Sequence, residues 1–162
     1  MDQKWVNETW EKFERKMRVT VPRAKGKLPY SAVDGVFDDW SYLPKMWTNG
    51  FSPGILWLLY AETKDDLYKN AAREAQALLD KAFEDYDGHN HDLGFMWELS
   101  SGADYRLTGN REARRTMLYA ANVLNGRYNL SGGYIRAWPD HIGWSIIDCM
   151  MNIPLLYWAS EE

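Results

Sequence analysis

The sequence predicts an all-α protein in which outer helices alternate with inner, buried helices. Some segments carry a single apolar stripe with residues three and four positions apart, as surface helices do, whereas others are apolar on every side, as buried helices are. The two kinds alternate at a spacing of about 40–50 residues, which is typical of stacked helical pairs. A strand-like alternation extends only over residues 134–138, which predicts a short ribbon within a loop.

The first pair begins with an outer helix predicted over residues 4–18. Residues 18–49 contain three prolines and two glycines, and they predict a long irregular connection of the kind that often carries function. An inner helix is predicted at residues 53–61, because Pro53 suits the first turn of a helix and the positions after it are apolar. The stripe of the outer helix consists of Val6, Trp10, Phe13 and Met17.

The second pair starts after a turn, where Asp65 is the expected N-cap of an outer helix. An inner helix is predicted from Leu93 to about Leu107, and Gly109 closes it. The outer stripe comprises Tyr68, Ala71, Ala72, Ala75, Leu79 and Phe83.

The third pair has a striped outer helix near residues 113–124, a second long loop at residues 126–139, and an inner helix predicted over residues 143–160. No striped helix follows to cover this last inner helix. We therefore expect that either further polypeptide or a second chain completes the fold.

Composition limits the classes of protein and partner. The 162 residues, of which 46% are hydrophobic, suffice for one domain with one core, residues 1–162. Lys and Arg number 19 against 23 Asp and Glu, and the net charge of -4 argues against nucleic acid or an anionic membrane as partner. The single Cys149, the charged first residues and the absence of a long apolar run predict a cytoplasmic protein without disulfides.

If the two kinds of helix alternate around an axis, the loops that lead from outer to inner helices meet at one rim. These loops are residues 45–51, 89–95 and 136–141. Inner-helix N-termini at this rim favour an anionic ligand such as a carboxylate. Trp47 and Trp138 offer flat faces that suit a sugar ring, although packing alone also accounts for either one.

Asp148 is expected inside the third inner helix, where apolar neighbours would desolvate its carboxyl group. Desolvation raises the pKa of a carboxyl group and keeps it protonated near neutral pH, as a general acid requires. A carboxyl group that only fixes packing, bonded for example to Asn152, fits the spacing equally well. The neighbours at helical spacing are Trp144, Ile147, Met151 and Leu155.

Asp92 directly precedes the inner helix that starts at Leu93, so it is expected to cap that helix and to stay ionised. An ionised Asp92 and a protonated Asp148 would form the divided carboxyl pair used in acid–base chemistry on sugars. His89 and His91 lie two residues apart without a defined third ligand, so no metal or other cofactor is expected. Cys149 is expected to serve packing only.

Four motifs together resemble unsaturated glucuronyl hydrolases. They fall in order from Trp47 to the C-terminus: Trp47–Gly54, His91–Met96, Ser100–Gly109 and Ile146–Asn152. The resemblance implies an (α/α)6 barrel about twice this length, so that the chain would form about half of the barrel, its N-terminal half. Ser52 departs from the family, in which that position is usually aromatic.

The resemblance also implies an activity. Such enzymes remove a 4,5-unsaturated uronic acid from the non-reducing end of lyase-generated oligosaccharides, of the glycosaminoglycan or gellan type, by hydration of the C4=C5 bond. Asp148 would be the general acid and base, and Asp92 would stabilise positive charge. His91, Trp47 and Trp138 would line the sugar subsite. The alternatives are an unsaturated rhamnogalacturonyl hydrolase and a non-catalytic sugar-binding half-barrel.

Overall fold

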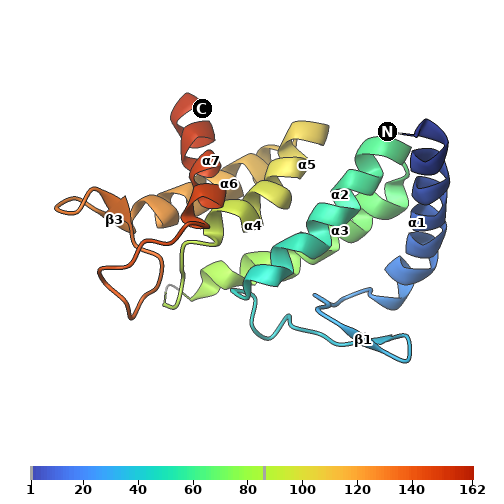
Figure 1. The fold of residues 1–162 in the computed structure, drawn as a ribbon, viewed down its shortest axis with the longest axis horizontal. Coiled ribbons are helices and arrows are strands. Elements are labelled where there is room, and N and C mark those ends of the chain that lie inside the picture. Colours follow the sequence, from blue (N-terminus) through green and yellow to red (C-terminus); the bar gives the residue numbers. More distant parts are fainter. Residues whose placement is uncertain (1, 86) are drawn as a thin grey trace.

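The computed structural model describes residues 2–85 and 87–162, and it is built mainly of helices, as predicted (Figure 1). Within these residues, no helix is long and apolar enough to cross a membrane. The α-helices are α1 (Gln3–Arg23), α2 (Phe51–Thr63), α3 (Asp66–Leu79), α4 (Leu93–Leu99), α5 (Ser101–Thr108), α6 (Arg111–Asn125) and α7 (Cys149–Glu161). The 3-10 helices are η1 (Trp47–Gly50) and η2 (Asp80–Glu84).

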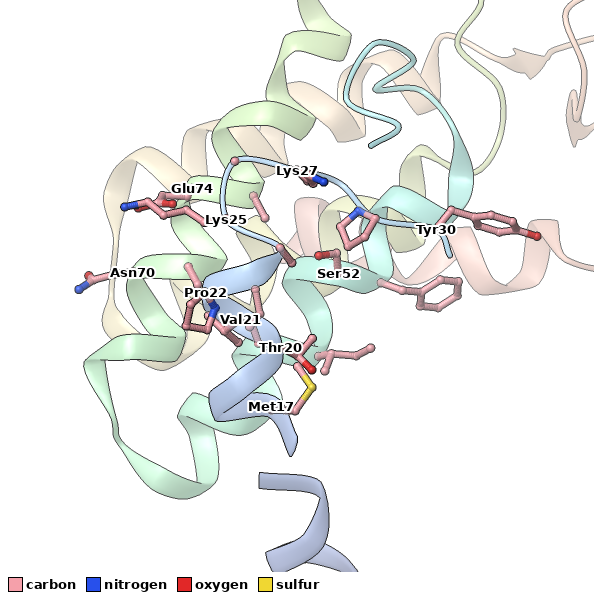
Figure 2. A pocket seen from close by; sticks show the side chains of 18 of the residues that line it. Met17, Thr20, Val21, Pro22, Lys25, Lys27, Tyr30, Ser52, Asn70 and Glu74 are labelled. Carbon is pink, nitrogen blue, oxygen red and sulfur yellow. The ribbon is translucent and has the colours of Figure 1, made fainter. Parts of the chain in front are cut away.

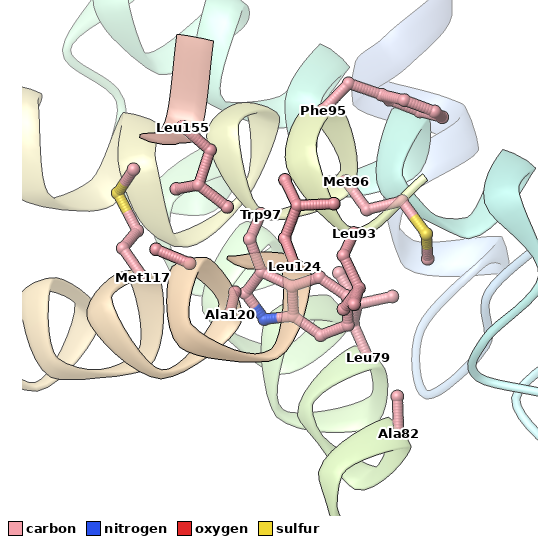
Figure 3. Close-up of a cluster of buried hydrophobic side chains, with 11 residues drawn as sticks. Leu79, Ala82, Leu93, Phe95, Met96, Trp97, Met117, Ala120, Leu124 and Leu155 are labelled. Carbon is pink, nitrogen blue, oxygen red and sulfur yellow. The ribbon is translucent and has the colours of Figure 1, made fainter. Parts of the chain in front are cut away.

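The helices form two groups along the chain. Helices α1, α2 and α3 lie together at one end of the molecule, and α4 to α7 lie together at the other (Figure 1). The first group packs around Trp57 and Tyr68. The second packs around Trp97, which Figure 3 shows among leucine side chains from α3, α4, α6 and α7. Outer helices α3 and α6 bury one stripe each, as their sequences predict.

The first outer helix extends beyond the predicted residue 18 and ends at Arg23, so it passes through Pro22. Proline is tolerated there because it lies in the last turn and is exposed, where one lost backbone hydrogen bond costs little. Arg18 pairs with Asp65 at 2.9 Å. Asp65 is the predicted N-cap of α3, since its Oδ1 accepts a hydrogen bond from the backbone N–H of Leu67 at 2.9 Å.

The long connection before α2 contains an antiparallel pair of short strands, β1 (Ala32–Val33) and β2 (Val36–Phe37). The turn between them has positive φ at Asp34 and Gly35, which is the conformation that an Asp-Gly hairpin adopts. The ribbon predicted at residues 134–138 is confirmed in part, because β3 (Tyr128–Asn129) pairs with β4 (Tyr134–Ile135).

The prediction of fully buried inner helices is wrong for one face of α2 and one face of α7. Helix α2 buries Leu56, Trp57 and Leu59, but the side of the helix that carries Leu58 is exposed. In α7, Met150 and Tyr157 are exposed while Leu155 is buried. Among the described residues nothing covers these two faces, so helix composition alone did not reveal where the packing stops.

Two helix boundaries also differ from the predictions. The inner helix expected over residues 93–107 is divided at Ser100. The φ of -100° and ψ of -92° at this residue are not helical, and they separate α4 from α5. The Ser100 hydroxyl group donates a hydrogen bond to the carbonyl oxygen of Met96 at 2.7 Å. The predicted end is confirmed, because Gly109 has a φ of 72° in the left-handed region. The last helix starts at Cys149 and not at residue 143, and this places Asp148 just before the helix.

Candidate active site

His91 lies at the centre of the candidate site, and its ring orientation is fixed by the loop that contains Trp138. The His91 backbone N–H donates to the carbonyl oxygen of Ala137 at 3.2 Å, and the ring Nδ1 lies 3.0 Å from the same oxygen. The His91 side chain is fully buried. Two of the three predicted rim loops therefore meet, as the alternation of outer and inner helices requires.

Two carboxylates converge on the other nitrogen of the same ring. His91 Nε2 lies 2.9 Å from Asp148 Oδ2 and 3.3 Å from Asp92 Oδ1. Asp92 directly precedes α4 and Asp148 directly precedes α7, so the packing of these two inner helices brings the acids together. His91 and Asp148, separated by 57 positions in the chain, thus lie at hydrogen-bond distance.

The surroundings of the Asp92 carboxyl group differ from the predicted ones. Asp92 is buried and makes no N-cap hydrogen bond with its side chain. Burial raises the pKa of Asp92 and the nearby Asp148 carboxylate raises it further, whereas His91 lowers it. The prediction that the Asp92 side chain caps its helix is therefore wrong, and its pKa is raised because the carboxyl group is buried with few hydrogen-bond donors.

The apolar surroundings predicted for Asp148 are also absent. Its side chain is 43% exposed, because it precedes α7 instead of lying inside the helix. Of the four expected neighbours, Leu155 is buried, while Trp144, Ile147 and Met151 are exposed. Asp148 Oδ1 is nevertheless enclosed and has no hydrogen-bond partner among the described residues. One carboxyl oxygen is therefore engaged by His91 and the other is left without a partner.

Asn152 joins α4 and α7 beside the acids, a role that was not predicted from the sequence. Its Nδ2 donates to the backbone carbonyl oxygen of Asp148 at 3.0 Å, and its Oδ1 accepts from the backbone N–H of Phe95 at 2.9 Å. The suggested contact with Asp148 thus exists, but through the main chain. Gly94 permits this close approach, because a Cβ atom there would lie 2.3 Å from Asn152 Cα.

The structure places the two predicted tryptophans differently. The Trp138 ring lies 5.0 Å from the His91 ring, nearly perpendicular to it, at the edge of the acid pair. Trp47 is 46% exposed and contacts the rings of Phe51 and Phe95, at the first turn of α4. Trp138 therefore contacts His91 directly, whereas Trp47 lies beside α4, the helix that follows Asp92. His141, also expected at the rim, is exposed and contacts Trp144.

Trp47 also borders a cavity of about 780 Å³ between the end of α1, the segment that follows it, α2 and α3. Figure 2 shows Met17, Val21, Tyr30 and Ser52 around this cavity. Ser52 contributes a small side chain to its wall. The cavity lies in the first helical group and does not include the acid pair.

His91, Asp148 and Cys149 are the described residues whose donor atoms come within 4.8 Å of one another in a set that could hold a metal ion. Their chemistry is mixed, since the set combines an imidazole, a carboxylate and a thiol. The Cys149 residue is buried and its sulfur lies 4.0 Å from the carbonyl oxygen of Ile135. The 2.9 Å between His91 Nε2 and Asp148 Oδ2 is the length of a direct hydrogen bond.

No family model matches the chain, but individual proteins do. An unsaturated chondroitin disaccharide hydrolase from Streptococcus pneumoniae is 42% identical over 122 residues, which is 72% of this chain and 31% of that protein. An unsaturated glucuronyl hydrolase from Bacillus sp. strain GL1 is 38% identical over 122 residues, 72% of this chain and 32% of that protein. The chain spans about a third of the length of these curated relatives.

Solved structures give the same result for the fold. The unsaturated glucuronyl hydrolase from Bacillus sp. GL1, described as responsible for the degradation of glycosaminoglycan, matches with a TM-score of 0.75 and 34% identity, over 88% of this chain and 40% of that one. An unsaturated glucuronyl hydrolase specific for heparin matches with a TM-score of 0.72 and 33% identity over the same shares. The matched structures are α/α barrels, and this chain has the fold of part of one. In sequence and in fold, the chain is therefore related to the unsaturated glucuronyl hydrolases, over the N-terminal portion of those proteins.

Proposed function

We propose that the protein removes a 4,5-unsaturated uronic acid from the non-reducing end of oligosaccharides by hydration of the C4=C5 bond. The observation that carries this proposal is the shared position of Asp92 and Asp148 on one nitrogen of His91, beside Trp138. Two carboxyl groups at one site can divide the tasks of proton transfer and charge stabilisation.

In the proposed reaction, Asp148 delivers a proton to C4 of the unsaturated sugar. Water then adds at C5 and returns a proton to the Asp148 carboxylate, and the hemiketal that forms collapses with cleavage of the glycosidic bond. The partial exposure of the Asp148 side chain supports this role, since a substrate can reach a half-exposed carboxyl group.

Asp92 stabilises the positive charge that develops on the sugar ring and holds the sugar hydroxyl groups. Its burial supports this role, because a charge in a water-poor site acts more strongly on its neighbours than an exposed charge does. His91 and Trp138 form the wall of the sugar subsite next to the acids, and Trp47 extends it along α4.

The substrate class follows the names of the relatives, which include an unsaturated chondroitin disaccharide hydrolase and an enzyme specific for heparin. We propose unsaturated disaccharides from glycosaminoglycans as substrates. The single free Cys149 suits a reducing compartment, in line with the expected cytoplasmic location.

We further propose that the exposed faces of α2 and α7 are covered in the active molecule by more polypeptide, because the relatives are longer than this chain. Sedimentation of the 162-residue chain tests this. Self-association through these apolar faces is the expected behaviour, and a well-behaved monomer that does not bind an apolar dye would contradict it.

The activity is tested with the protein at the length that its gene encodes. The conjugated double bond absorbs ultraviolet light, so hydration of an unsaturated chondroitin disaccharide is followed as a loss of absorbance. Asp148→Asn is expected to reduce the rate by about 10³-fold, the effect of losing a general acid. Asp140→Asn is the matched control, because Asp140 is an exposed acid that also pairs with a histidine, His141.

Full activity of Asp148→Asn would contradict the role of that residue. Activity on unsaturated rhamnogalacturonan fragments in place of the chondroitin disaccharide would favour the other enzyme class. Sugar binding without any absorbance loss would indicate a non-catalytic module.

A further inference from the structure

The position of protons on His91 follows from the groups around its ring. The Ala137 carbonyl oxygen, 3.0 Å from Nδ1, has no hydrogen to give, so Nδ1 must carry the proton in this contact. The same carbonyl oxygen accepts from the guanidinium group of Arg127 at 3.0 Å, which holds it in place. The tautomer with a proton on Nε2 alone would leave Nδ1 and this carbonyl oxygen as two facing acceptors.

The other side of the ring then lacks a donor. Nε2 lies 2.9 Å from Asp148 Oδ2 and 3.3 Å from Asp92 Oδ1. If His91 were neutral with its proton on Nδ1 and both acids were ionised, three acceptors would face one another in a buried place. Such an arrangement costs free energy, because buried polar atoms without partners are unfavourable and like charges repel. One more proton must therefore be present in this group.

We propose that His91 is a positioning residue that holds a second proton on Nε2 and supplies it to Asp148 during the reaction. The doubly protonated ring donates Nδ1–H to Ala137 and shares Nε2–H between the two carboxylates. The titratable and charged groups around it are Asp92 before α4, Asp148 before α7, the Cys149 thiol on α7 and, behind the Ala137 carbonyl, the Arg127 guanidinium group. The use of this proton in catalysis rests on the proposed function.

The proton balance closes over one turnover. The Nε2–H proton passes to Asp148, and the Asp148 O–H bond breaks as the C4–H bond forms from the electron pair of the double bond. Water then bonds to C5 through its oxygen, and the proton that it loses goes to Asp148 and back to Nε2. No oxidant, reductant or further reactant is needed.

This arrangement also explains how a half-exposed acid can serve as a proton donor. Asp148 lacks the hydrocarbon surroundings that would keep it protonated by burial. A neighbouring imidazolium at hydrogen-bond distance provides the proton instead.

Nuclear magnetic resonance of the chain with 15N-labelled histidine tests the proton positions without any activity measurement. The chain has three histidines, which can be assigned one by one by substitution. We expect both ring nitrogens of His91 to be protonated at about pH 7. A neutral His91 ring at that pH, in either tautomer, would overturn the proposal.

Variants provide the second part of this test. Asp148→Asn should lower the pH at which His91 loses its second proton by about one unit or more, since an opposite charge is removed. His141→Gln is the matched control, because that exposed histidine also pairs with an acid, and it should leave the His91 signals unchanged. An Asp148→Asn variant with unchanged His91 titration would contradict the proposal.

The catalytic use of the proton is tested by the pH profile of kcat/KM. In His91→Gln the decline at alkaline pH should begin about one unit lower than in the native protein, because the imidazolium that supplies the proton to Asp148 is then absent. A uniform loss at every pH would show that His91 serves structure only. Addition of a chelator distinguishes a proton from a metal at Nε2, and lost activity or altered His91 signals would contradict the proton assignment.

Discussion

Two buried aspartates, both in the second helical group, have opposite surroundings. Asp104 on α5 is fully buried, and its carboxylate accepts two hydrogen bonds from Arg73, at 2.9 and 3.1 Å, one from Thr108 at 2.7 Å and one from Asn110 at 2.8 Å. Burial raises its pKa, but these donors outweigh burial and the pKa is lowered. Asp92 is almost as buried, yet its pKa is raised.

The difference lies in the supply of donors. The Asp104 carboxylate is saturated, so it joins α3, α5 and the start of α6 as a fixed structural unit. Asp92 shares a single histidine nitrogen with a second acid. An acid with saturated hydrogen bonds stabilises the fold, whereas an acid left short of donors is available for chemistry, and its cost to stability marks a functional site.

The largest expected effect concerns the glycine beside each aspartate. A Cβ atom at Gly94 would lie 2.3 Å from backbone atoms of Asn152, so Gly94→Ala must separate α4 from α7 and should lower the free energy of unfolding by about 3 kcal/mol. Gly102→Ala is the matched control near Asp104, because its Cβ would meet the flexible end of Met117, nearest at 2.9 Å. Urea denaturation checks both variants, and equal losses would contradict the close approach of α4 and α7.

Replacement of the saturated acid should be next in size. Asp104→Asn removes the charge that Arg73 faces and presents an amide group to existing donors, so the free energy of unfolding should fall by about 2–3 kcal/mol. The half-exposed side chain of Arg73 moderates the loss, since water can solvate its charge. An Asp104→Asn variant as stable as the native chain would show that the network contributes nothing.

Asp80 sharpens the comparison with a third carboxyl group. It accepts one hydrogen bond, from Trp97 Nε1 at 2.9 Å, and burial raises its pKa from 3.8 to about 6 despite that bond. The folded chain thus holds this proton to higher pH than the unfolded chain, so the stability it contributes is lost as pH rises from 3.8 to about 6.

Asp80→Asn should remove this loss of stability at rising pH. At about pH 7 the variant should be more stable than the native chain by up to about 2 kcal/mol, and at about pH 4 the two should be nearly equal. Denaturant midpoints at the two pH values provide the measurement. An equal gain in stability at both pH values would show that the substitution acts through packing and not through the titration of Asp80.

The smallest effect is expected at the candidate site itself. Asp92→Asn removes a buried charge that lacks donors, so the stability at neutral pH should stay the same or rise by about 1 kcal/mol. The same isosteric change is thus expected to lower the free energy of unfolding at Asp104 and to maintain or raise it at Asp92. Thermal unfolding of both variants in one buffer makes the comparison, and a clear destabilisation by Asp92→Asn would show that Asp92 is a structural acid after all.

Much of the fold could be predicted from local sequence. The stripes of α3 and α6, the Asp65 N-cap and the Gly109 end of α5 all depend on neighbouring residues, and each is confirmed. The Asp34-Gly35 pair is typical of a hairpin turn, but the hairpin was not predicted, because the strands on either side have only two residues each.

The candidate site was predicted residue by residue but not in its electrostatics. His91, Asp92 and Asp148 lie in the motifs and Trp138 lies in a predicted rim loop, and the structure brings these four together. Their surroundings could not be predicted, because the start of α7 was placed at residue 143 and Asp148 was therefore assigned to a buried helix. The role of Asn152 had no sequence signal beyond a polar residue in an apolar helix.

The sequence by itself determined which segments become helices and which acids lie next to them, because helix periodicity, caps and motifs are written in residues a few positions apart. Only the tertiary structure decided that Asp92 and Asp148 share one histidine nitrogen, and which of them is buried. The physical reason is that burial and the number of available hydrogen-bond donors depend on how distant helices pack. His91 and Asp148 are separated by 57 positions, so no local sequence pattern specifies their contact.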